Sequence, residues 1–406
     1  MEFLRDIARQ TLAPLRRAKT PDLPPLARDE ALKDSLGLPL QDPGPHRVVG
    51  ECLAWIACAQ DCSTSEDGGV ARHFSLISGW GASYPETTGY IVPTMLAGAR
   101  QTGQSQYVER AKRMLDWLVE IQFPEGGFQG GVIGAEPRVP VTFNTGQILL
   151  GLAAGTKEFG EPRYRNAMNR AADWLRETQD EDGCWRRFPT PFAEPGEKAY
   201  ESHVAWGLLE AARIESRQDW AEAALRNVRW SLKHQRPNGW IDQCCLLDPS
   251  RPLSHTLGYA LRGLVEAYRY SAEPELLQAA ERTGRGLMGA MNAEGFLPGR
   301  LHSDWRAAVS SACLTGTAQA ACCWYLLHDM TGDATHIDAA RVATRYVRRT
   351  VRVDGAAETR GAVKGSFPID GDYGRFEYLN WACKFLLDAN LLEIAANDRL
   401  KDGVTS

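Results

Sequence analysis

One spacing of aromatic, Gln and Gly residues recurs along the chain and constrains its fold more than any other feature. In the segment AADWLRETQDEDGCW, Gln179 follows Trp174 by five positions and Gly183 follows it by nine. Strict or looser copies of this spacing begin at Trp55, Trp117, Trp230, Gly286 and Tyr346. The starting residues are 62, 57, 56, 56 and 60 positions apart. Such a period suits two helices and two loops, so the sequence predicts six copies of one helical hairpin.

The two helices of each repeat differ in how apolar residues are distributed. Between Tyr164 and Gln179, apolar side chains share one face and charged side chains the other, as in a surface helix. The helix expected after each glycine is apolar nearly all round, which is typical of a helix enclosed by protein. These inner helices are expected at Glu86 to Ala99, Asn144 to Ala154, Ser202 to Arg213, His255 to Arg269, Leu314 to His328 and Tyr378 to Glu393. An outer ring around an inner ring predicts an all-α fold, an (α/α)6 toroid.

The domain organisation follows from the extent of the repeats. They run from about Trp55 to the C-terminus without a linker, so we expect one toroid domain over residues 47–406. Before it, residues 1–46 are expected to hold a short basic amphipathic helix at 2–18 and then a proline-rich stretch. We expect residues 20–46 to lack regular structure and to lie along the outside.

Composition and charge exclude several classes of function. The chain is 44% hydrophobic and 24% charged, as in globular proteins, and its net charge of −5 gives no general attraction for nucleic acid. No apolar run is long enough to span a bilayer and no signal peptide is evident, which predicts a cytoplasmic protein with at most peripheral membrane contact through residues 2–18. We expect the ten cysteines to be reduced and structural.

The candidate site lies where the inner helices begin. In a toroid these N-terminal ends and the loops before them meet at one mouth, and the sequence is richest in acids, histidines and aromatic residues there. The candidate catalytic residues are Tyr84, Glu86, Glu201, His203, His255, Asp372 and Glu377. The candidate substrate-binding residues are Trp80, Tyr90, Phe143, Asn144, Tyr200, Asp304, Trp305, Arg306, Tyr373 and Tyr378.

This combination of aromatic rings and carboxylates favours a carbohydrate ligand. The C–H faces of a sugar stack on aromatic rings, and its hydroxyls bind carboxylates. Hydrolysis of a glycosidic bond would need two carboxyl groups drawn from Glu86, Glu201, Asp372 and Glu377. Elimination or epimerisation of a uronic acid would instead need Tyr84, His203, His255 or Tyr378 to move a proton, with Arg306 or Arg375 as the cation. None of these reactions requires a metal or a cofactor, and we expect none.

The repeat resembles the QW motif of the squalene-hopene cyclase and prenyltransferase superfamily, which implies the toroid fold. The DxDD acid motif of the cyclases is only half matched, by Asp370-Gly371-Asp372-Tyr373, and there is no DDxxD run. Protein prenyltransferases bind zinc through Asp, Cys and His, but the spacing of Asp242, Cys244, Cys245 and His255 matches no zinc pattern. The Cys, Cys-His zinc set of lanthionine cyclases is likewise not recognisable.

Two further stretches, Gly79 to Ile91 and Gly365 to Phe385, are similar to segments of uncharacterised toroid proteins of bacterial exopolysaccharide and lipopolysaccharide clusters. This resemblance implies a role in making or trimming a surface glycan, or its lipid-linked precursor. The sugar 2-epimerases and unsaturated glucuronyl hydrolases, which are also toroids, support carbohydrate chemistry by analogy. The alternatives are a terpene or prenyl-chain enzyme of the QW superfamily and a toroid that binds glycans without catalysis.

Overall fold

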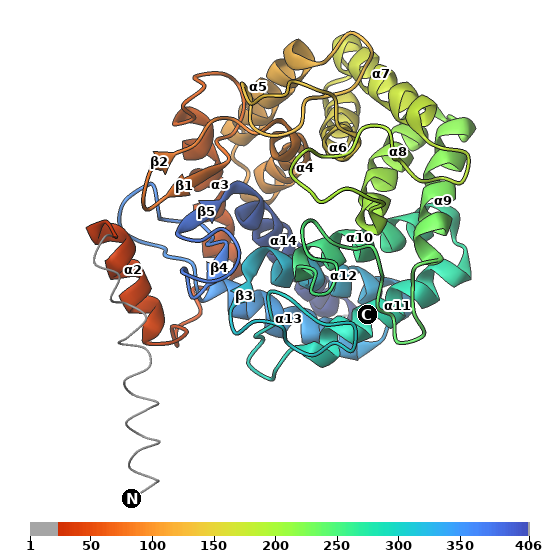
Figure 1. The fold of residues 1–406 in the computed structure, drawn as a ribbon. Coiled ribbons are helices and arrows are strands. Elements are labelled where there is room, and N and C mark those ends of the chain that lie inside the picture. Colours follow the sequence, from red (N-terminus) through yellow and green to blue (C-terminus); the bar gives the residue numbers. More distant parts are fainter. Residues whose placement is uncertain (1–22, 405–406) are drawn as a thin grey trace, which may run out of the picture.

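The computed structural model, which describes residues 23–404, is a closed double ring of helices (Figure 1). The outer helices are α3 (Pro45–Asp61), α5 (Gln106–Ile121), α7 (Pro162–Thr178), α9 (Gln218–Leu232), α11 (Pro274–Ala290) and α13 (Ala334–Arg348). The inner helices are α4 (Pro85–Thr102), α6 (Thr142–Phe159), α8 (Ser202–Glu215), α10 (Ser254–Ser271), α12 (Leu314–Thr331) and α14 (Asn380–Val404). Each inner helix packs against the next, and α14 packs against α4 and closes the ring. The predicted (α/α)6 toroid is confirmed.

The Gln of the repeat ties neighbouring outer helices together. Gln179 lies just after α7, and its Nε2 donates to the carbonyl oxygen of Gly183 at 3.0 Å and to that of Ala223 in α9 at 2.9 Å. Its Oε1 accepts from Arg226 of α9. The Gln122 amide makes the equivalent bonds to Gly126 and Ala167. The repeat motif therefore positions each hairpin against the next.

The glycine of the repeat is needed at a close approach. Gly183 has a φ of +98°, and a Cβ there would lie 2.6 Å from the carbonyl oxygen of Arg226. Both the left-handed backbone and the missing space exclude a side chain. The fifth copy shows a different solution, because a Cβ at Gly286 would lie 2.2 Å from the ring of Trp305. Trp305 thus occupies the place of the anchor aromatic that this copy lacks.

The prediction that residues 20–46 lack regular structure is wrong for Pro25–Ser35, which form helix α2. The proline at the first turn favours helix initiation, because its fixed φ is helical and its missing N–H would have no partner there. Buried Lys364 Nζ lies 2.8 Å from Glu30 Oε1 and 2.5 Å from Asp34 Oδ1. These ion pairs dock α2 on the loop before α14. The amphipathic helix predicted at 2–18 lies outside the described residues.

Short strands join the first and last repeats. β1 (His73–Ser75) pairs antiparallel with β2 (Gly79–Trp80) and with β5 (Glu377–Leu379). A second pair joins β3 (Ala312–Cys313) to β4 (Ser366–Phe367). The inner helix predicted from Tyr378 therefore begins two residues later, at Asn380, because Tyr378 pairs with Phe74 in the sheet. Glu377 faces Ser75 in this sheet, and its side chain contacts Arg72 and His73.

Within residues 23–404, no helix combines the length and apolarity that crossing a membrane would need. All ten cysteines are free thiols, most of them buried in the toroid.

Candidate active site

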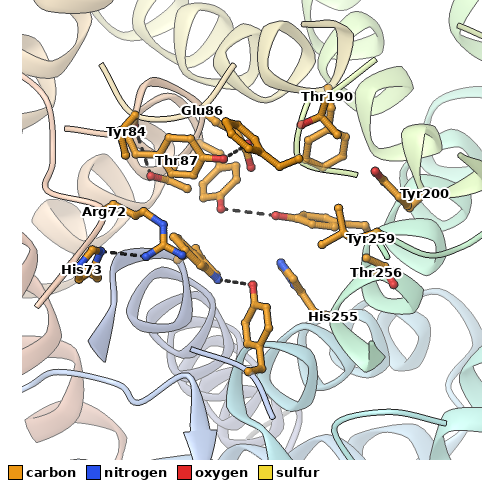
Figure 2. Close-up of a pocket in the computed structure, with 18 of the residues that line it drawn as sticks. Arg72, His73, Tyr84, Glu86, Thr87, Thr190, Tyr200, His255, Thr256 and Tyr259 are labelled. Carbon is orange, nitrogen blue, oxygen red and sulfur yellow. Dashed lines mark hydrogen bonds between the residues drawn. The ribbon is translucent and has the colours of Figure 1, made fainter. Parts of the chain in front are cut away.

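A cavity of about 620 Å³ opens at the mouth of the toroid where the inner helices begin (Figure 2). Its wall comes from the starts of α4, α6, α10 and α14 and from the loops before the inner helices. The lining residues are Arg72, His73, Tyr84, Glu86, Thr87, Tyr90, Gly131, Val132, Ala135, Phe143, Thr190, Phe192, Tyr200, Leu246, Leu247, His255, Thr256, Tyr259, Tyr373 and Trp381. Side chains far apart in the sequence thus share one cavity.

Among the described residues that line the cavity, Glu86 is the only one with a carboxyl side chain. It lies in the first turn of α4, where it is 8% exposed, and Tyr84 Oη donates to its Oε2 at 2.9 Å. Burial raises the pKa of Glu86 to about 7, although the hydrogen bond from Tyr84 and the charge of Arg72 act in the opposite direction. A carboxyl group with this pKa is partly protonated near neutral pH, which suits proton transfer in either direction.

Arg72 brings a fixed positive charge to the same cavity. Its Nη1 donates to Glu377 Oε2 at 3.0 Å and to His73 Nδ1 at 2.8 Å, and its guanidinium lies 5.1 Å from the centre of the Trp381 ring. Because His73 Nδ1 accepts this bond, its proton is on Nε2, which lies 3.8 Å from Glu377 Oε1. Burial, and secondarily Arg72, lowers the pKa of His73, and Glu377 opposes this shift. Glu377, His73 and Trp381 therefore hold the guanidinium in place on the cavity wall, where it can bind an anionic ligand.

His255 is oriented by a buried glutamine. Its Nδ1 lies 2.6 Å from Gln319 Oε1, an acceptor, so Nδ1 carries the proton and Nε2 is left as a lone pair. Burial lowers the pKa of His255 to about 4, and Gln319 partly offsets this shift. The imidazole is thus neutral near pH 7 and is a hydrogen-bond acceptor on the cavity wall.

Aromatic rings form much of the remaining wall. Tyr259 lies between two imidazoles, 4.5 Å from the ring centre of His255 and 4.6 Å from that of His203. Its hydroxyl lies 3.4 Å from that of Tyr90. Trp381 Nε1 donates to Tyr373 Oη at 3.0 Å. These contacts fix rings and hydroxyls together, an arrangement that can stack against a sugar and bind its hydroxyls.

The structure brings seven of the sequence-predicted residues together in the cavity wall. Two of them, Glu86 and His255, are candidate proton-transfer groups, and Tyr84 is hydrogen-bonded to Glu86 (Figure 2). The seven are Tyr84, Glu86, Tyr90, Phe143, Tyr200, His255 and Tyr373.

Three other predicted residues are buried in the toroid and do not line the cavity. His203 Nδ1 lies 2.6 Å from Gln147 Oε1, and burial lowers its pKa well below the usual value. Glu201 is 4% exposed, and its Oε2 has no hydrogen-bond partner among the described residues. Burial raises the pKa of Glu201 to about 8. Asn144 is 1% exposed within α6.

The other predicted residues lie elsewhere, mostly in surface or sheet contacts. Exposed Asp372 pairs with Arg300, and Asp304 pairs with Arg306 on the surface. Trp80 packs on Trp55 with ring centres 5.7 Å apart. Glu377 supports Arg72, Tyr378 is buried in β5, and Trp305 packs against Trp240. None of these seven predicted residues lines the cavity.

Sequence reasoning missed Arg72, His73, Thr190, Phe192, Tyr259 and Trp381. Arg72 and His73 precede the GWGASYPETTGY segment, and backbone pairing with Gly81 and Ala82 on one side and with Leu379 and Asn380 on the other places them at the mouth. A signal was available for Tyr259, because it lies one helical turn after His255 and so shares its face.

No group of three or more His, Cys, Asp or Glu side chains within residues 23–404 is arranged to hold a metal ion.

Comparisons with known proteins agree with this architecture. Residues 85–262 match the family model of the squalene-hopene cyclase C-terminal domain. No curated protein matches the sequence. Among solved structures, an unsaturated glucuronyl hydrolase specific for heparin is 15% identical with a TM-score of 0.70, covering 87% of this chain and 98% of its own. Unsaturated glucuronyl hydrolase from Bacillus sp. GL1 is 16% identical with a TM-score of 0.68, at coverages of 86% and 96%.

Cellobiose 2-epimerase from Bacillus thermoamylovorans is 11% identical with a TM-score of 0.65, covering 85% of this chain and 97% of that one. Such low identities establish the fold and not the reaction. The match of the family model, the six closed hairpins and these neighbours together show that the chain has the α/α-toroid fold.

Proposed function

We propose that this protein is a carbohydrate-active enzyme that transfers a proton at C5 of a uronic acid residue in a glycan. The observation that carries the proposal is the placement of Arg72, Glu86 and His255 on one aromatic-walled cavity. Structural neighbours that act on glycans, by their names glucuronyl hydrolases and a cellobiose epimerase, support the same substrate class. A cytoplasmic location and a role in surface-polysaccharide metabolism belong to the same proposal.

Each of the three side chains has a separate part. Arg72 binds the carboxylate of the sugar by charge-assisted hydrogen bonds. Ionised Glu86 takes the proton from C5, and the C–H electron pair moves into the substrate carboxylate, where Arg72 stabilises the added charge. Neutral His255 accepts a hydrogen bond from a sugar hydroxyl through Nε2. Tyr84 keeps the Glu86 carboxyl oriented.

Two outcomes follow from the same first step. Elimination results when the C4–O4 bond breaks, a C4–C5 double bond forms, and Glu86 returns its proton to the leaving oxygen. Epimerisation results when C5 takes a proton from solvent water on its opposite face and Glu86 releases the proton that it took to solvent. Hydrolysis by a pair of carboxyl groups is less well supported, because Glu86 is the acid among the described residues lining the cavity.

Incubation with uronic acid oligosaccharides in deuterated water tests the proposal. We expect deuterium at C5 or absorbance from an unsaturated product. Glu86→Gln is expected to lower kcat at least about 100-fold, because the proton acceptor is lost. Arg72→Gln is expected to raise KM for the uronic acid substrate and to spare a neutral analogue.

Arg306→Gln is the matched control, because Arg306 is exposed and paired only with Asp304. It should behave as wild type. New reducing ends without deuterium uptake or unsaturation would support hydrolysis instead. Binding without any turnover would support a glycan-binding toroid.

A second candidate, an enzyme of prenyl or terpene chains, is favoured by the aromatic wall and by the match of residues 85–262 to the cyclase model. Protonation of a carbon–carbon double bond needs a strong acid, however, and burial raises the pKa of Glu86 to about 7. Incubation with squalene and isoprenoid diphosphates, followed by extraction of cyclic or transferred products, decides between the two candidates.

A further inference from the structure

The opening of the cavity carries an apolar rim formed by Val132, Phe192, Leu246 and Leu247. Phe192 and Leu247 line the cavity and yet are 53% and 56% exposed, so they mark where it meets solvent. They come from the loops before α8 and α10, and Val132 comes from the loop before α6. Three successive repeats therefore each place an apolar side chain at the same edge.

The loops of this apolar rim are held by specific hydrogen bonds. Gln129 Nε2 donates to the carbonyl oxygens of Val132 and Ala135, each at 3.1 Å. The Ile133 N–H donates to Ser83 at 2.8 Å and the Glu194 N–H to Leu246 at 2.8 Å. A Cβ at Gly131 would lie 2.6 Å from Phe192 Cζ, so the ring rests directly on the Gly131 backbone. The apolar side chains are thus presented on a supported edge.

The polarity of the cavity changes from its interior to its opening. Arg72, Glu86 and His255 are charged or polar groups on the inner wall, whereas the apolar rim offers no charged group. Eight large hydrophobic side chains of the described residues are exposed, and two of them, Phe192 and Leu247, lie at this opening. A ligand that complements both ends has a polar head and an apolar chain.

We infer that the apolar rim binds a lipid chain attached to the sugar, so that the substrate is a lipid-linked saccharide or glycolipid. The placement of the sugar in this inference rests on the proposed function, whereas the placement of the lipid chain rests on the apolar rim alone. The sugar enters the cavity towards Arg72, and the chain leaves across Phe192 and Leu247. Each fully buried methylene contributes about a fourfold gain in affinity, so a short alkyl chain is enough for a test.

The experiment compares methyl and octyl β-glycosides of glucuronic acid and of glucose by calorimetric titration. For the wild type we expect the octyl glucuronide to bind at least tenfold more tightly than the methyl glucuronide, by the same estimate. Phe192→Ser/Leu247→Ser is expected to lose most of this gain, measured as the ratio of octyl to methyl affinity within the same variant. Because both side chains are more than half exposed, the variant is expected to fold, which a thermal melt verifies.

Leu36→Ser/Leu40→Ser is the matched control, because these leucines are 85% and 90% exposed but lie outside the cavity. It should keep the full gain. Equal binding of methyl and octyl glycosides, or a gain that survives in the rim variant, overturns the inference. An equal gain in affinity when a second sugar replaces the octyl chain also overturns the inference. A chain-length gain accompanied by equal affinities for the glucoside and the glucuronide, both unaffected by Arg72→Gln, upholds the rim and rejects the proposed role of Arg72.

Discussion

At the scale of single residues, the histidine–glutamine pairs on either side of Tyr259 allow a controlled comparison. His255 with Gln319 faces the cavity, and His203 with Gln147 makes the same 2.6 Å contact away from it. Gln319→Leu removes the acceptor that fixes the His255 tautomer, so we expect KM to rise about tenfold or more. Gln147→Leu should cost similar stability and leave KM unchanged. Nitrogen chemical shifts of the imidazoles report the tautomers directly, and a normal KM in Gln319→Leu would exclude this positioning role.

Glu201 provides a second prediction at this scale, on stability. Burial raises its pKa from 4.5 to about 8, so in this window the folded chain keeps a proton that the unfolded chain releases. The free energy of unfolding should therefore fall as pH rises from 4.5 to 8. Glu201→Gln should flatten this fall by up to a few kcal/mol. Urea unfolding at both ends of the window measures it, with exposed Glu222→Gln as the control that retains the wild-type slope.

At the scale of elements, a glycine after an outer helix allows consecutive hairpins to approach closely. Gly239 has a φ of +84°, and a Cβ there would lie 2.3 Å from the carbonyl oxygen of Arg282. Gly160 has a φ of +67°, but a Cβ added there would have no atom within 4 Å. We expect Gly160→Ala to cost about 1 kcal/mol from the left-handed backbone alone, and Gly239→Ala about 2–4 kcal/mol, because it adds the steric clash. Equal losses in denaturant unfolding would contradict this account.

At the scale of the whole molecule, the N-terminal segment and the last repeat are held together by buried charges. Lys364 is 3% exposed and pairs with both Glu30 and Asp34 of α2. Lys364→Met leaves two buried carboxylates without a cation, so we expect a loss of about 3–5 kcal/mol in the free energy of unfolding. Lys33→Met is the control, because Lys33 is exposed and its 3.4 Å pair with Glu30 is worth less than about 1 kcal/mol. A small effect of Lys364→Met in calorimetry would show that α2 is not held by these pairs.

The repeat, the two classes of helix and the mouth as the place for a site could all be predicted from the amino-acid sequence. These features depend on local spacing: the Gln that reaches the next outer helix and the glycine at the close approach are readable one repeat at a time. Within the site, Glu86 and His255 were found because they begin inner helices.

Which of the candidate residues meet in the cavity depends on contacts between distant parts of the chain. The backbone of Arg72 bonds to nearby Ala82 and to distant Asn380, and its side chain bonds to Glu377. The last two contacts join residues about 300 positions apart, and no local pattern encodes them. Glu201 and His203 share the start of α8 with no cavity contact, because the direction of a side chain around a helix depends on how that helix is rotated against its neighbours. The repeat fixes which residues can approach the mouth, and packing around the closed ring fixes which of them face it.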